Sequence, residues 1–172
     1  MKSKDSLYRL AQYLILWITG GFVYVLIELA YRGRSHWSMA VVGGLCFILI
    51  GAINEKEHTI PGILHFESQA VCGAFVTTLV ELFSGIIINM ILHWNVWDYS
   101  DVPFNILGQI CLPFTIIWVF IAAAAIILDD FLRHILFMEP FPTYYSIIMK
   151  KNVNVFELWE RYVCKDRHHK EM

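Results

Sequence analysis

Four long apolar runs divide the chain, and each is about as long as a membrane-spanning helix. They cover about residues 11–31, 37–53, 69–94 and 108–128. A hydrocarbon core about 30 Å thick needs about 20 helical residues, because a helix rises about 1.5 Å per residue. The runs are continuous and do not alternate between apolar and polar positions, which favours helices over barrel strands. The pattern predicts an all-α, polytopic membrane protein with a bundle of four transmembrane helices.

The chain beyond the fourth run is of a different kind. Residues 135–149 are apolar but interrupted by a glutamate and two prolines, which favours a surface-lying segment over a fifth span. In Asn152–Tyr162 apolar residues recur at helical spacing beside charged ones, which predicts an amphipathic helix on the membrane surface or on a partner. We therefore divide the chain into a four-span domain, 1–133, and an interfacial or cytoplasmic tail, 134–172.

The basic residues predict the orientation. Of the 13 Lys and Arg residues, all but Arg32 and Arg34 fall on the side that also holds both termini. Because Lys and Arg are enriched in cytoplasmic loops, both termini are expected in the cytoplasm, with the chain in the cell membrane. Aromatic residues collect at the opposite boundary, where they are expected as interfacial anchors: Trp37, Trp94, Trp97 and Tyr99.

The composition agrees with a membrane protein. Hydrophobic residues make up 58% of the chain and charged residues 16%, against about 45–50% and about 25% in soluble domains. The net charge of −2 gives no basic field for nucleic acid, so the lipid bilayer is the expected partner. The four cysteines show no C-x-x-C spacing, and neither a P-loop nor a G-x-S-x-G motif is present. No metal, cofactor or enzymatic activity is therefore expected.

Glu81 is the strongest candidate functional residue, because it lies at the middle of the third span. A carboxylate there costs at least about 2.5–3.5 kcal/mol on insertion scales unless it is protonated, paired or facing a polar cavity. It either binds a proton, cation or polar substrate inside the bundle, or holds helices together through hydrogen bonds to Thr77, Thr78 or Ser84.

Glu28 lies in the outer part of the first span, and Arg32 follows it by one helical turn. An i,i+4 pair in this order is favourable and would form an interfacial ion pair. In the alternative arrangement, Glu28 faces Glu81 across antiparallel helices, and the two carboxylates share a proton or a cation.

The outer loop, residues 97–105, is rich in groups that cap turns or bind ligands. It is expected either to form a lid, with Asp98 or Asp101 opposite Arg32 and Arg34, or to be a rigid turn. At the opposite end of the fourth span, Asp129 and Asp130 are expected at a hydrated helix end.

One stretch carries a specific resemblance. Its residues are Glu81-Leu-Phe-Ser-Gly85, Trp97-Asp-Tyr-Ser100, Pro103-Phe-Asn105, Gly108, Ile110-Cys-Leu112 and Trp118. Over about residues 70–130 the chain resembles the bacterial family described as "putative ABC-transporter type IV" (CmpB-like) and its small vertebrate transmembrane relatives; Glu28 falls where that family has an acidic residue. The resemblance implies a transporter permease of the bacterial inner membrane. Four spans line little pore, so a permease of this size must form a homo-oligomer or join an ATPase or another membrane subunit.

Three hypotheses follow. In the first, the chain is a transporter permease or a transporter-associated subunit with a polar pocket. The expected binding residues are Glu81, Glu28, Asp98, Arg32, Tyr99 and Asn105. In the second, it is a scaffold, sensor or accessory protein that binds a partner through its tail. An intramembrane enzyme is the third and least favoured, because one carboxylate without a nucleophile or metal rarely suffices.

Overall fold

The computed structural model describes residues 2–59 and 65–154, with side chains for 6–55 and 65–154. Its helices are α1 (Lys2–Arg32), α2 (Trp37–Thr59), α3 (Phe66–Gly85) and α4 (Leu112–Phe137), and α3 continues as a π-helical turn, Ile86–Ile91. Two short hairpins complete the described part: β1 (Asn105–Ile106) with β2 (Ile110–Cys111), and β3 (Tyr144–Ser146) with β4 (Lys151–Val153).

Within the described residues, four helices are long and apolar enough to cross a membrane, which confirms the predicted fold class. The chain is therefore a multi-pass membrane protein. The fourth span differs from its predicted range, 108–128, at both ends. Residues 108–111 belong to the hairpin β1–β2, and α4 runs from Leu112 to Phe137. Gly108 has φ of 66°, which a helix does not accept, and Pro113 suits a helix start because its missing N–H is not needed there.

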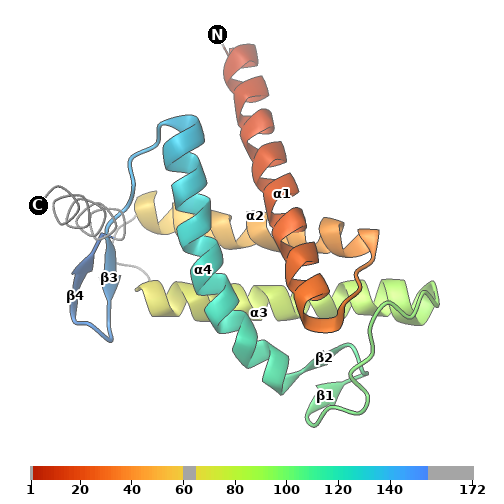
Figure 1. Cartoon of the computed structure of the whole chain (residues 1–172). Coiled ribbons are helices and arrows are strands. Elements are labelled where there is room, and N and C mark those ends of the chain that lie inside the picture. Colours follow the sequence, from red (N-terminus) through yellow and green to blue (C-terminus); the bar gives the residue numbers. More distant parts are fainter. Residues whose placement is uncertain (1, 60–64, 155–172) are drawn as a thin grey trace, which may run out of the picture.

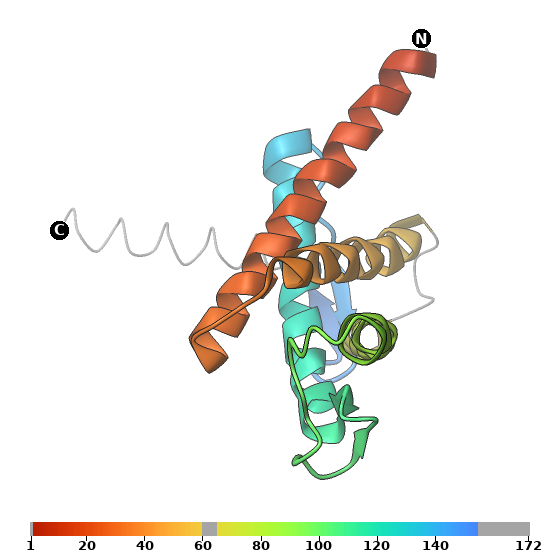
Figure 2. The ribbon, with the colours of Figure 1, turned by 90° about the vertical axis from the view of Figure 1, so that its right-hand side faces the viewer.

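The helices are arranged as two pairs. α1 packs mainly on α2 and α4 mainly on α3, while α2 and α3 contact each other. Figure 1 shows α1 and α4 lying across α2 and α3 on the same side of them. In the second view, α3 is seen end-on while α4 stands upright, so these two helices cross steeply (Figure 2). α1 and α4 make few contacts with each other, which leaves a gap between them.

Glycines let α1 and α2 approach closely, as their small-residue pairs predict. A Cβ on Gly21 would collide with the backbone carbonyl of Ala40, and one on Gly43 would collide with the side chain of Tyr24. Lipid offers little hydrophobic drive for helix association, so such close packing is the main attraction between two spans. These contacts fix α1 on α2 and so determine where Tyr24 lies.

The described part of the tail folds back on the bundle. The backbone N–H of Ile147 donates a 3.0 Å hydrogen bond to Glu67, at the start of α3, and the Ser146 hydroxyl also donates to this carboxylate. The hairpin β3–β4 therefore lies beside the start of α3, as Figure 1 shows. Most of the predicted amphipathic helix Asn152–Tyr162 lies outside the described residues, whereas Asn152 and Val153 belong to β4.

Candidate functional site

Glu81 is buried at the centre of the bundle, with 3% of its surface exposed. The Tyr24 hydroxyl donates a 2.7 Å hydrogen bond to its Oε1 atom, and the Trp118 indole N–H donates one of 2.8 Å to its Oε2 atom. The two donor rings stack on each other, with centroids 5.5 Å apart. Both carboxylate oxygens are therefore held by aromatic donors from α1 and α4.

This arrangement connects three helices through one carboxylate. Glu81 belongs to α3, Tyr24 to α1 and Trp118 to α4. The sequence indicated the importance of Glu81, and one of its two alternatives placed the hydrogen bonds of Glu81 on neighbours along its own helix. In the structure, the hydroxyls of Thr78 and Ser84 donate instead to backbone carbonyls of α3. Tyr24 is the partner that sequence reasoning missed, whereas Trp118 was part of the quoted motif.

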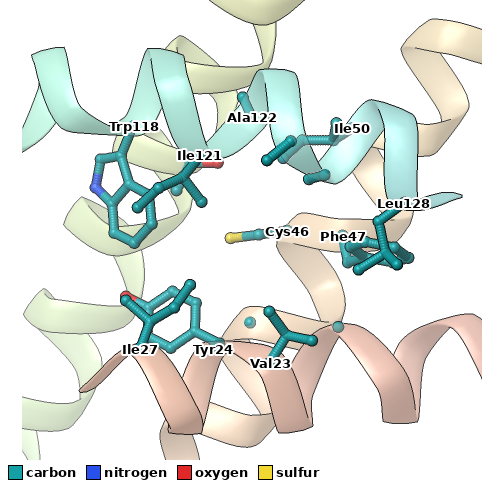
Figure 3. A pocket seen from close by; sticks show the side chains of 15 residues that line it. Val23, Tyr24, Ile27, Cys46, Phe47, Ile50, Trp118, Ile121, Ala122 and Leu128 are labelled. Carbon is teal, nitrogen blue, oxygen red and sulfur yellow. The ribbon is translucent and has the colours of Figure 1, made fainter. Parts of the chain in front are cut away.

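An apolar crevice of about 170 Å³ lies between α1 and α4, beside this carboxylate. Figure 3 shows Val23, Tyr24 and Ile27 facing Trp118 and Leu128 across it, with Cys46 of α2 pointing in from behind. Glu81 itself does not line the crevice, because its two donor rings form the wall in between. The space next to Glu81 is therefore apolar, and not the polar pocket that the sequence predicted.

Glu28 and Arg32 form the i,i+4 ion pair that one of the two sequence alternatives described. The Ser35 hydroxyl donates to the other oxygen of Glu28, and the Arg32 guanidinium donates a 3.1 Å hydrogen bond to the carbonyl of Val96. No hydrogen bond joins Glu28 to Glu81 among the described residues. The pair therefore attaches the end of α1 to Val96, the residue that precedes the outer loop.

The outer-loop candidates stabilise the loop itself. Asp98 is exposed and accepts hydrogen bonds of 2.6 and 2.9 Å from the Ser100 hydroxyl and N–H, which hold its pKa below the usual value. The Asn105 side-chain amide donates hydrogen bonds to the carbonyls of Ser100 and Val102. Tyr99 stacks on Phe114, and burial raises the pKa of its hydroxyl. These contacts are those of the rigid-turn alternative, and Asp98 has no ion pair with Arg32 or Arg34 in the described structure.

A second polar network, around Asn89, was not predicted from the sequence. The Asn89 amide donates hydrogen bonds to the Trp97 carbonyl at 3.0 Å and to Gln109 at 2.8 Å, and its oxygen accepts the N–H of Val96 at 2.7 Å. The Trp97 indole donates to the Gln109 carbonyl at 2.9 Å, and only 4% of Trp97 is exposed. The prediction of Trp97 as an interfacial anchor is therefore wrong, because the loop folds it inward.

The prediction of a hydrated end at Asp129 and Asp130 is also wrong. Both are buried, because α2 and the tail hairpin pack against this part of α4, which continues to Phe137. Asp129 accepts a 2.7 Å hydrogen bond from Arg133, and Asp130 accepts one of 2.7 Å from Asn54. A signal was present: Trp118, Ala122, Ile126, Asp129 and Arg133 follow at intervals of three or four residues. This spacing places them on one helix face.

Tyr144, in the tail hairpin, also belongs to the group formed by Asp129, Asp130, Arg133 and Asn54, which we call the inner cluster. Its hydroxyl donates to Asp130, and burial together with that carboxylate raises the pKa of Tyr144. Arg133 also contacts Glu55 and lies 3.7 Å from a carboxylate oxygen of Glu139. Several acidic groups therefore surround one guanidinium, which makes Arg133 the main compensating charge. No group of His, Cys, Asp and Glu in the described residues has the geometry of a metal site.

The fold defines a four-span membrane protein whose central carboxylate is held by aromatic donors. The profile of the family described as "putative ABC-transporter type IV" matches residues 15–157, so the chain belongs to that family. The match extends over the first spans and into the tail, beyond the region where the sequence resemblance was found. No curated protein and no solved structure matches the chain. Family membership makes it a transporter-related membrane protein.

Proposed function

We propose that the chain is a membrane subunit of a transport system and that it takes the acyl chain of a lipid-like substrate into the α1–α4 crevice. The observation that carries this is the crevice itself: apolar, about 170 Å³ in volume, and lined by the two rings that hold Glu81. An engineered apolar cavity of about 150 Å³ stays dry and binds benzene, so a space of this size accommodates part of a hydrocarbon chain.

The position of the crevice favours entry from the membrane. α1 and α4 are both long enough to span the bilayer, and they make few contacts with each other. Ala124 lines the crevice and is also exposed. A hydrocarbon chain is the apolar group that a bilayer supplies at this depth, so no polar entrance is required.

Glu81 serves as a positioning group in this proposal. Its hydrogen bonds hold Tyr24 and Trp118 in one orientation, and these rings form the wall of the crevice. The Glu28–Arg32 pair would hold the end of α1 against the carbonyl of Val96. Asp98, Tyr99 and Asn105 keep the outer loop closed over the bundle and do not touch the substrate. Because the chain has no P-loop, we place ATP hydrolysis in a separate subunit.

The test uses the chain purified in mild detergent together with its bound subunits. Ala124→Phe should fill the mouth of the crevice, while Ala123→Phe adds the same ring to the neighbouring position, which does not line it. A phospholipid with a photoreactive diazirine on its acyl chain should label peptides of α1 and α4 in the wild type and in Ala123→Phe. We expect Ala124→Phe to lose most of this labelling, together with any stimulation of ATP hydrolysis by phospholipid.

Equal labelling of the two variants would overturn the acyl-chain site. A second outcome is that Ala124→Phe loses the labelling but leaves the ATP hydrolysis of the complex unchanged. This result would overturn the transport role and retain the binding site.

A scaffold function is the second candidate, and one observation favours it. Both oxygens of Glu81 are occupied by donors from the protein, and the adjoining space is apolar, which is the arrangement of a structural connection. A scaffold would need no acyl-chain binding, so Ala124→Phe would then leave partner recovery and labelling unchanged.

A further inference from the structure

A second cavity lies at the end of the bundle where α1 turns into α2, and it shares no lining residue with the crevice. Its volume is about 190 Å³. Its walls come from the α1–α2 turn and from the segment that follows the π-helical turn. The lining residues are Arg32, Arg34, Ser35, His36, Trp94, Asn95 and Val96.

The charge of this cavity is positive. Arg32 is neutralised by Glu28, whose second oxygen is occupied by Ser35. Arg34 is exposed and forms no hydrogen bond or ion pair with any residue that the structure describes. Of the two acidic groups predicted to oppose it, Asp98 is committed to Ser100, and Asp101 forms no ion pair with Arg34 in the part of the chain that the structure describes. One guanidinium therefore faces the cavity without a carboxylate partner.

The remaining walls supply neutral polar groups and aromatic rings. His36 uses its Nδ1 atom on the Ser38 hydroxyl, which leaves Nε2 uncommitted. Its ring lies 5.4 Å from the rings of both Trp37 and Trp94. These two tryptophans are 65% and 43% exposed, as expected of rings at the depth of lipid headgroups. Exposed tryptophans at the ends of spans are typical of the depth at which a bilayer presents phosphate.

We propose that this cavity binds a phosphate group, with the Arg34 guanidinium as its main ligand and Asn95 and His36 as neighbours. A planar guanidinium donates two parallel hydrogen bonds to phosphate oxygens, and such charge-assisted bonds are about twice as strong as neutral ones. The phosphate belongs either to the headgroup of an anionic phospholipid or to inorganic phosphate. This site is separate from the crevice and does not depend on the proposed transport function.

Calorimetric titration of the full chain in detergent distinguishes the sources. The probes are dihexanoyl-phosphatidylglycerol, inorganic phosphate and, as a control, dihexanoyl-phosphatidylcholine, whose phosphate is already paired with choline. Arg34→Gln removes the free guanidinium, and Arg9→Gln removes the same charge from an exposed position at the other end of α1. Asn95→Asp places a negative charge in the cavity and keeps a residue type that tolerates the φ of 49° found there.

We expect Arg34→Gln and Asn95→Asp each to weaken phosphatidylglycerol binding about tenfold, which converts to about 1.4 kcal/mol, while Arg9→Gln binds like the wild type. Binding of phosphatidylglycerol alone supports a headgroup site. Binding of inorganic phosphate as well, with the same dependence on Arg34, supports a site for phosphate itself. The proposal is overturned if neither probe binds saturably, if phosphatidylcholine binds as tightly, or if Arg9→Gln causes the same loss.

Discussion

The hydroxyl of Tyr24 lies 2.7 Å from Oε1 of Glu81, so a residue of the first span satisfies the carboxylate at the middle of the third. Together with the hydrogen bond from Trp118, this contact connects α1 and α4, which otherwise make few contacts with each other. The buried glutamate therefore contributes to helix arrangement, whatever ligand the protein carries.

Tyr24→Phe should destabilise the protein by about 1 kcal/mol. The ring remains, but Oε1 of Glu81 loses its donor. Bonds to charged groups contribute about 1.5–3 kcal/mol in proteins generally. Interhelical bonds in membranes average about 0.6 and reach about 1.7 kcal/mol. Unfolding by SDS in mixed micelles measures the difference. Tyr31→Phe removes the hydroxyl of an exposed tyrosine and should stay within about 0.5 kcal/mol of the wild type; equal losses would show that the Glu81 contact contributes nothing.

Gly21→Ala should separate α1 from α2 and cost about 1–3 kcal/mol, as overpacking does in other cores. The added Cβ meets the backbone carbonyl of Ala40, which cannot rotate away as a side chain would. Gly33→Asn is the matched control, because its site is open and its φ of 68° suits Asn. The same SDS titration checks both. If the two variants were equally stable, the close approach of α1 and α2 would not hold.

Arg133→Gln should be the most destabilising single change in the inner cluster, by about 3–5 kcal/mol. Its loss leaves buried carboxylates without a compensating charge, which is the costly way to break a buried pair. Adding Asp129→Asn should recover part of the stability, because one uncompensated charge is removed. Lys150→Gln, at an exposed position, serves as the control. A double variant less stable than Arg133→Gln would contradict this account.

Asn89→Leu should loosen the outer loop. The substitution removes three hydrogen bonds and leaves the N–H of Val96 and the carbonyl of Trp97 without their partner. Hydrogen exchange of residues 94–111 should rise at least about tenfold while that of α2 stays unchanged. Met90→Leu, at the neighbouring exposed position, should leave exchange unaltered. Equal protection in the Asn89 variant would mean that the loop is held by other contacts.

Ser100→Ala should raise the pKa of Asp98 toward its usual value of about 3.9. The Ser100 hydroxyl is the first cause of the lowered pKa, and its N–H is the second. Because the pKa of Asp98 is lower in the folded loop than in the unfolded chain, its ionised form stabilises the folded loop at pH values above the unfolded-state pKa. This stabilisation is lost as the pH falls through the folded-state pKa. Carboxyl carbon chemical shifts followed by NMR report the titration. Ser84→Ala, whose hydroxyl bonds within α3, should not move it.

The four spans follow from the sequence because hydropathy is a local property. A run of about 20 apolar residues must cross the bilayer as a helix, whatever surrounds it. The Glu28–Arg32 pair was also within reach, since residues four apart on a helix are neighbours. The family resemblance likewise rested on the order and spacing of residues within one stretch of the chain, 81–118, and the profile match confirms it.

Contacts between helices were not accessible in this way. Spacing places Asp129 on the same helix face as Trp118, but only the packing of α2 and the tail hairpin against that face makes it buried. In the same way, the sequence placed Glu81 at membrane depth. Its bond to Tyr24 depended on how α1 packs on the other spans, and its bond to Trp118 on how α4 crosses α3. Hydropathy along the chain therefore specifies which segments enter the membrane. What each polar group meets there depends on how the helices pack, because partners on different helices are set by rotation and register, which no local pattern specifies.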